Sequence, residues 1–212
     1  MIIQNIVGQP AAGANNAILS GRSGQLGETI MQELHGRYYE TTYRNNSFLL
    51  SVSTAAAVTA YSGGAGGTPM LALFNPTGSG RNAVINKVSI GSVVAASAAG
   101  TVAFGLYFGT TATITQATTV TPWNMLTQQQ SGSFMTGFRN VALTSSTAAS
   151  NAVALASYYW ATAAGVGNVS PAVTDIEGAI IIPSGSYLAL GGSAALTSAT
   201  WIGSLQWEEV PV

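Results

Sequence analysis

The stretch SATWIGSLQWEEV, residues 198–210, alternates two kinds of side chain. Odd-numbered positions from 201 to 207 hold Trp, Gly, Leu and Trp, whereas even-numbered positions from 202 to 208 hold Ile, Ser, Gln and Glu. Because successive residues of a strand point to opposite faces of a sheet, one face of this stretch is suited to a core. The pattern therefore predicts a half-buried strand, with Glu208 and Glu209 at a solvated strand end.

Short runs rich in β-branched and other apolar residues recur along the chain before this stretch, separated by glycine, proline, asparagine and serine. Together with it they predict strands at Ser47–Val58, Met70–Phe74, Asn82–Val94, Thr101–Phe108, Gly132–Arg139, Asn151–Trp160, Ile176–Ile182, Ser186–Leu190 and Thr197–Glu208. These runs do not alternate with helical patterns, so a parallel sheet is not expected. We expect an all-β fold, a jelly-roll-like two-sheet antiparallel sandwich, with an up-and-down barrel as the alternative.

Two segments carry strong turn signals between apolar runs. FNPTGSGRN at residues 74–82 and IPSGSYL at residues 182–188 each place proline, glycine and serine between two strands. Proline ends the pairing of a ladder, and glycine permits a positive φ in the turn. Both segments therefore predict tight connections between neighbouring strands.

The first 46 residues differ from the rest of the chain. The segment from residue 1 to about 24 is rich in Gly, Ala and Asn and has weak apolar periodicity, which predicts an extended or irregular arm. Leu26, Ile30, Leu34 and Tyr38 follow at helical spacing, with Ser23 as a candidate N-cap and Gly36 as a candidate stop. We expect residues 1–46 to form an N-terminal arm with at most one short helix, and residues 47–212 to form the β domain.

The composition excludes several classes of protein. Charged residues make up 6% of the chain and the formal net charge is −1, so no basic stripe is available to bind nucleic acid. No window approaches the roughly 18 apolar residues of a membrane-spanning helix, and the N-terminus lacks the pattern of a signal peptide. The absence of cysteine rules out disulfides and thiolate metal sites. A charge density this low suits a surface that is hidden in an assembly, or an extracellular surface that does not need charge for colloidal repulsion.

Candidate catalytic groups are few. His35 lies between Glu33 and Arg37, but residues two apart point to different faces of a helix, which disfavours a general base oriented by a carboxylate. Asp175 and Glu177 are two positions apart and share one face of a predicted strand. A glycosidase pair needs carboxyl groups that face each other across a cleft, and a Ca²⁺ site of the EF-hand type needs a loop spacing that is absent here. A hydrolase that uses these groups is therefore the least favoured hypothesis about function. The sequence predicts no catalytic residue, cofactor or metal.

The segment ELHGRYYETTYR, residues 33–44, concentrates charge and aromatic side chains. Six of the thirteen charged residues fall within residues 22–44, and the next 36 residues carry none. Arginine and tyrosine are enriched at protein interfaces because they combine contact area with directional hydrogen bonds. We therefore predict an interface formed by Glu33, His35, Arg37, Tyr38, Tyr39, Tyr43 and Arg44, against the alternative that this segment is a solvated surface of the β domain.

Three segments together resemble a known family. GQLGETIMQELHGRYYETTYRNNSF, then LALFNPTGSGRNAVINKVSIG, and finally IIIPSGSYLALGG with WIGSLQWEEVP resemble small virion proteins of tailed bacteriophages, in particular head decoration or cement proteins. The resemblance spans most of the chain and rests on its overall pattern.

The resemblance implies a jelly-roll-like domain, commonly a homotrimer, that binds the outside of an icosahedral capsid where subunits of the major capsid protein meet. It also implies a location on the virion, with passage through the host cytoplasm during assembly. The alternative function is a head-fibre, tail or receptor-binding module for host glycans, which would use the aromatic run Tyr158–Trp160 because aromatic rings stack on apolar sugar faces.

Overall fold

The computed structural model describes residues 6–7, 22–23, 37–52, 56–57, 68–94, 104–110, 114, 119–130, 132–139, 151–156, 172–192 and 200–212. The chain divides into two compact units, Met1–Tyr39 and Glu40–Val212. In the first unit, β1 (Ile6–Val7) pairs in parallel with β2 (Arg22–Ser23). The short helix α1 (Tyr39–Tyr43) spans the division between the units.

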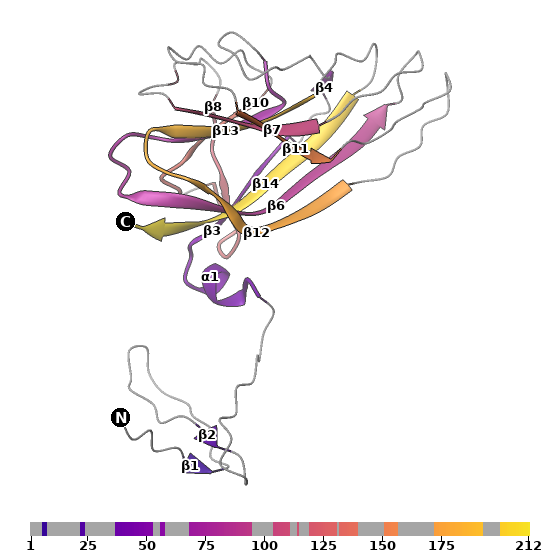
Figure 1. Ribbon diagram of the computed structural model, residues 1–212. Coiled ribbons are helices and arrows are strands. Elements are labelled where there is room, and N and C mark those ends of the chain that lie inside the picture. Colours follow the sequence, from indigo (N-terminus) through magenta and orange to yellow (C-terminus); the bar gives the residue numbers. More distant parts are fainter. Residues whose placement is uncertain are drawn as a thin grey trace. The chain divides into compact units, whose positions relative to one another are not determined.

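The second unit is an antiparallel sandwich of two sheets (Figure 1). One sheet, here called the β14 sheet, has the order β12-β6-β14-β3-β9, and β4 also pairs with β14. Its strands are β3 (Ser47–Ser51), β4 (Ala56–Ala57), β6 (Arg81–Val94), β9 (Trp123–Asn124), β12 (Ala172–Ile182) and β14 (Thr200–Pro211). The other sheet, the β13 sheet, has the order β11-β7-β13-β5-β10-β8. Its strands are β5 (Leu71–Asn75), β7 (Phe104–Thr110), β8 (Thr119–Val120), β10 (Thr136–Arg139), β11 (Asn151–Ala156) and β13 (Ser186–Gly192).

The pairing of the eight principal strands defines the topology. Taken in chain order, the first pairs with the last (β3 with β14) and the second with the seventh (β5 with β13). The third pairs with the sixth (β6 with β12) and the fourth with the fifth (β7 with β11). Such nested antiparallel pairing, folded into two facing sheets, is the jelly roll. The fold class predicted from the sequence is therefore confirmed.

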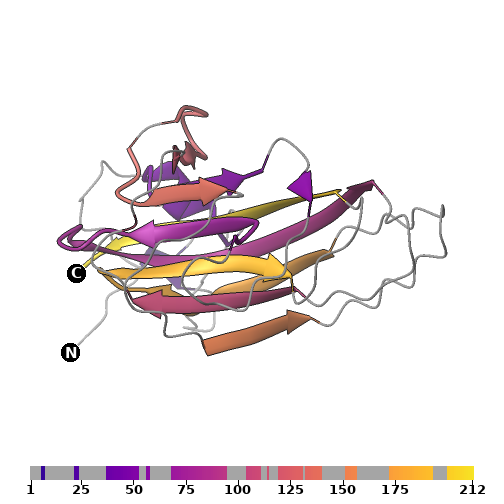
Figure 2. The ribbon, with the colours of Figure 1, turned by 90° about the horizontal axis from the view of Figure 1, so that it is seen from above.

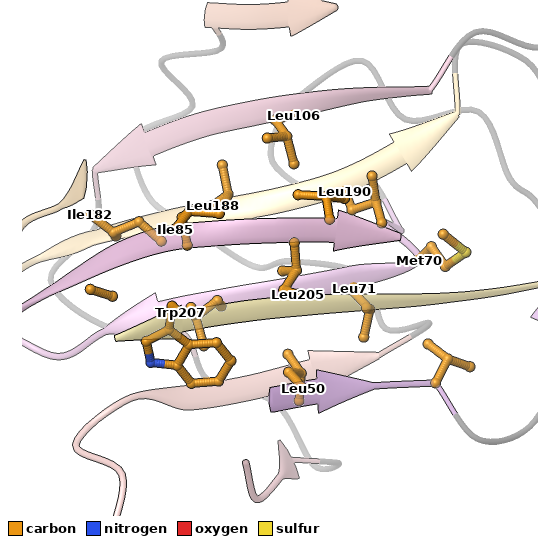
Figure 3. Close-up of a cluster of buried hydrophobic side chains, with 14 of the residues drawn as sticks. Leu50, Met70, Leu71, Ile85, Leu106, Ile182, Leu188, Leu190, Leu205 and Trp207 are labelled. Carbon is orange, nitrogen blue, oxygen red and sulfur yellow. The ribbon is translucent and has the colours of Figure 1, made fainter. Parts of the chain in front are cut away.

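The core lies between the facing sheets and receives one face of each (Figures 1 to 3). Trp201, Leu205 and Trp207 of β14 are all buried, as the alternation of this strand predicts. The Trp207 ring stacks on Phe48 with a centroid distance of 6.1 Å, and the Trp201 ring contacts Phe104 of the opposite sheet at 4.9 Å. Burial of each such side chain stabilises the fold by about 1.5–3 kcal/mol.

The central strands of the β13 sheet are buried on both of their faces. Its strands β5 and β13 show continuous burial rather than alternation. The residues that point away from the main core form a second apolar cluster, to which Ile114 packs: Ala72, Phe74, Tyr107, Phe138, Tyr187 and Ala189. Near-continuous apolar sequence in these strands therefore reflects a sheet buried on two sides.

Both predicted turns are present and are held together by one asparagine. Gly78, Gly80 and Gly185 have φ values of 81°, 66° and 76°, a region that only glycine enters without strain. Asn75 is fully buried, and its Nδ2 donates to the carbonyl oxygens of Arg81 at 2.7 Å and Ile182 at 3.0 Å. The end of β5 is therefore bonded to the beginning of β6 and the end of β12, in the opposite sheet.

The structure differs from the sequence-based expectation at several elements. Most of the helix expected from Leu26 lies outside the described residues, and α1 begins only at Tyr39. The expected strand Ser47–Val58 is represented by β3 and the separate β4, and the short strands β8 and β9 are not apparent from the sequence. The second compact unit begins at Glu40, and the domain boundary after residue 46 stays a prediction. The carbonyl oxygens of Asn45 and Asn46 accept hydrogen bonds from Asn124 and Glu209 of the sandwich.

Candidate functional site

A polar hollow opens at one end of the sandwich, where residues 44–46 enter β3. Its volume is about 190 Å³. We call it the Arg81 hollow, and it is lined by Arg44, Asn45, Asn46, Phe48, Arg81, Gly132, Phe134 and Glu209. These residues come from four separate stretches of the chain, so the fold, and not a local motif, assembles the site.

Backbone hydrogen bonds fix the segment that enters β3. The carbonyl oxygen of Asn46 accepts from the amide of Glu209 at 2.9 Å. The carbonyl oxygen of Asn45 accepts from Nδ2 of Asn124 at 3.3 Å, and that of Ser47 accepts from the amide of Met125 at 3.0 Å. Asn45 itself has a φ of 66°, in the left-handed region that asparagine tolerates better than most residues. The segment is therefore attached to both β14 and the turn after β9.

Glu209 is a buried acid on the core-facing side of β14, with only 2% of its surface exposed. Its carboxylate accepts hydrogen bonds from the Ser133 hydroxyl at 2.6 Å and from the Phe134 amide at 3.1 and 3.2 Å. The indole Nε1 of Trp207 donates to it at 3.4 Å. A buried carboxylate is tolerated when such donors surround it, and here it fixes residues 133–134 against β14.

The expectation that Glu208 and Glu209 form a solvated strand end is wrong for Glu209. Glu209 continues the odd-numbered, inward-facing series of Trp201, Leu205 and Trp207, whereas Glu208 belongs to the other face. The signal was present in the alternation of the strand. The opposite expectation follows from the general preference of adjacent acids near a strand end for water, which the donors around Glu209 offset here.

Arg81 and Phe134 form the mouth of the hollow. The guanidinium carbon of Arg81 lies 4.8 Å from the centroid of the Phe134 ring, in cation–π geometry. Phe134 is 50% exposed. Among the described residues, no carboxylate lies within ion-pair distance of Arg81. The Phe134 ring, and not an acid among the described residues, therefore orients the Arg81 guanidinium.

Arg44 provides the second guanidinium of the hollow. Its Nε donates to the Glu40 carboxylate at 2.6 Å, one helical turn earlier in the chain. Both side chains are mostly exposed, and exposed pairs of this kind contribute only about 0.3–0.5 kcal/mol. The pair positions Arg44 weakly and does not use its two terminal nitrogens.

Large apolar side chains are exposed on the segments that adjoin the hollow. They are Tyr43, Trp123, Met125, Leu126, Phe134 and Val210. Register places Trp123 beside Leu49 on the outer face of the β14 sheet, and Met125 bonds to the first residue of β3. We call these residues together with the hollow the docking end. Exposed apolar groups concentrated in this way mark interaction surfaces.

The predicted interface residues are divided by the structure. Tyr43 and Arg44 belong to the second unit, and Tyr43 is 64% exposed. Arg37, Tyr38 and Tyr39 belong to the first unit. Glu33 and His35 lie outside the described residues. The interface stays a prediction, and Arg81 and Phe134, which sequence reasoning missed, have no sequence signal that links them, because they are 53 positions apart.

The two carboxylates considered for catalysis are exposed on β12 and have different surroundings. Asp175 lies opposite Lys87 of β6 and forms an ion pair with it at 3.3 Å. Glu177 has a φ of 55° within an irregularity of the β12 ladder. Among the described residues, no group of three or more His, Cys, Asp or Glu side chains is placed to hold a metal ion. The aromatic run Tyr158–Trp160 lies outside the described residues, and so the glycan reading stays a prediction.

Comparison with known proteins gives no relative. No protein-family model, no curated protein and no solved structure matches the chain. In the described part of the chain, no helix is long and apolar enough to cross a membrane. Arguments about function therefore rest on the fold and on the docking end.

Proposed function

We propose that this protein is a structural subunit of a virus particle, a decoration or cement protein that binds the outside of an icosahedral bacteriophage head and stabilises it. Its partners are the major capsid protein and sister copies of itself in a homotrimer. In this role it needs no catalytic residue and no cofactor, and it passes through the host cytoplasm only during assembly.

The docking end is the observation that carries the proposal. Six large apolar side chains are exposed there, around two guanidinium groups, at the place where the N-terminal residues join the sandwich. Arginine and aromatic side chains with an apolar surround are the composition of protein interfaces. The jelly roll adds support only by analogy, since this fold occurs in capsid proteins and also in lectins.

A cement protein acts through binding linkage. If each copy binds the assembled shell more tightly than separated capsid subunits, it shifts the equilibrium toward the intact particle. A homotrimer that contacts several capsid subunits at once gains effective concentration without any new contact. The low charge of the chain is consistent with a surface that is largely covered by neighbours.

Two measurements test this function. The mass of the free protein in solution should be close to three times 21.5 kDa. The protein should also sediment with purified particles of the virus that encodes it, in a fixed number of copies per particle. A free monomer that is absent from purified particles would contradict the proposal.

A further inference from the structure

We propose that the Arg81 hollow binds a carboxylate side chain, an aspartate or glutamate of the protein on which the docking end docks. The inference rests on the proposed function in taking its ligand from a partner protein. It adds to that function the chemical class of the group that is recognised.

The donors of the hollow outnumber its available acceptors. Arg81 and Arg44 each carry a guanidinium, whose planar fork matches the two oxygens of a carboxylate. The acid in the lining, Glu209, is already bonded to Ser133, Phe134 and Trp207 and is buried behind them. The hollow therefore favours a negatively charged group that can accept hydrogen bonds.

The geometry of Arg81 is suited to recognition rather than to fold stability. Its guanidinium is held over the Phe134 ring at 4.8 Å, and the Phe134 amide is in turn bonded to the Glu209 carboxylate. A preorganised guanidinium loses less side-chain entropy when a ligand binds. The buried Glu209 thus fixes the Phe134 ring on which the partly buried Arg81 guanidinium lies.

The size of the hollow selects the kind of ligand. Sites for drug-sized molecules and cofactors usually have volumes of about 300–1,000 Å³, and this hollow has about 190 Å³. It admits one side chain. The exposed apolar residues of the docking end would surround that side chain and exclude water, as residues around an interface anchor do.

The test uses the full-length protein and two small probes, N-acetyl-glutamate amide and N-acetyl-glutamine amide, which differ in the carboxylate. In an NMR titration, the amide signals of Gly132 and Phe134 should move saturably with the glutamate probe, with a dissociation constant on the order of millimolar, and should stay in place with the glutamine probe. Equal responses to both probes, or no response to either, would overturn the proposal.

Variants of Arg81 show whether the response comes from the hollow. Arg81→Gln should weaken binding of the glutamate probe by about tenfold or more, and Arg81→Lys, which keeps the charge but not the planar fork, should weaken it less. Lys87→Gln is the matched control, because Lys87 is on the same strand but pairs with Asp175 on the outer face of the sheet. Loss of binding in the control equal to that in Arg81→Gln would contradict the assignment.

A third arm separates a protein side chain from a free anion. Inorganic phosphate should move the same signals less than the glutamate probe does, and a stronger response to phosphate would overturn the choice of a carboxylate ligand. The probes report on the hollow alone, whereas sedimentation with particles reports on the proposed function. Particle binding without probe binding would reject only the carboxylate site, and probe binding without particle binding would reject only the virion role.

Discussion

Glu209 is the residue on which the geometry of the docking end depends. It is buried, and three groups donate to its carboxylate: the Ser133 hydroxyl, the Phe134 amide and the Trp207 indole. The ring of Phe134 in turn supports Arg81. A carboxylate near the end of the last strand therefore determines the shape of a surface formed by residues 81 and 132–134.

We expect Glu209→Gln to lower the free energy of unfolding by about 1.5–3 kcal/mol, the usual value of hydrogen bonds to a charged group. The glutamine side chain keeps one acceptor oxygen, but its NH₂ group is a donor and would face the groups that donate to Glu209. Glu208→Gln is the matched control, because Glu208 is on the opposite face of the strand, and it should change the free energy by less than about 0.5 kcal/mol. Urea unfolding measures both, and equal effects would contradict the structural role of Glu209.

Tyr107 supplies a prediction about pH. Burial against the outer face of the β13 sheet raises the pKa of this phenol above its usual value of 10.0. Between pH 10 and the raised pKa, the folded protein therefore retains a proton that the unfolded chain loses. The contribution of Tyr107 to the free energy of unfolding should be constant below pH 10 and should fall as the pH rises from 10 toward the raised pKa.

Tyr107→Phe should remove part of that decline. Urea unfolding at a series of pH values should give parallel curves for the two proteins below about pH 9, with a shallower fall for Tyr107→Phe above pH 10. An identical slope in both proteins above pH 10 would show that burial of Tyr107 does not contribute.

Among the elements, the close pairing of β7 and β13 depends on a glycine. Gly109 lies opposite Tyr187 in the ladder, and a Cβ atom at position 109 would overlap the buried Tyr187 ring. The ring thus occupies the space that the missing side chain leaves. A hollow lined by Gly109 and Tyr187 together with the end of β12 opens at the same place.

Gly109→Ala should lower the free energy of unfolding by about 1–3 kcal/mol, the usual cost of overpacking a core. Gly91→Ala on β6 is the matched control, because its new Cβ would meet the Ile202 side chain at an ordinary 3.5 Å. That change should stay within about 0.5 kcal/mol. Thermal or urea unfolding of the pair decides, and a Gly109→Ala protein as stable as the control would contradict the close packing.

The sequence predicts the elements well where alternation is strong and poorly where tertiary contacts decide. The strand at Thr200–Pro211 follows from the period of two, and the turns at residues 76–80 and 183–185 follow from proline and glycine. The strands β8 and β9 have only two residues each, too few for a period to emerge. Their pairing with β10 and β3 depends on the rest of the fold.

The candidate site was less predictable than the fold. A cluster of arginine and tyrosine at residues 37–44 suggested an interface, and the docking end includes Tyr43 and Arg44 from it. Arg81, Phe134 and Glu209 join them only because the beginning of β6, the segment before β10 and the end of β14 lie on the same side of the sandwich. The jelly-roll topology brings these three residues together, and no local sequence pattern indicates it.

At the scale of the whole molecule, the division between Tyr39 and Glu40 leads to a truncation experiment. Deletion of residues 1–39 leaves the bonds of Asn45 and Asn46 to the sandwich in place, so the truncated protein should keep a cooperative unfolding transition. It should associate with virus particles more weakly than the full-length protein, because it keeps the docking end but lacks Arg37, Tyr38 and Tyr39 of the predicted interface. Full occupancy of particles by the truncated protein would contradict a docking role for the arm.

The most direct test of the central claim is a cryo-EM map of the virus particle that contains this protein. The claim predicts jelly-roll density in groups of three on the outside of the head, with Arg44, Arg81 and Phe134 of each copy buried against the shell or a sister copy. An acidic side chain should occupy the hollow. Density for the protein with these residues facing solvent, or a particle without it, would contradict the account.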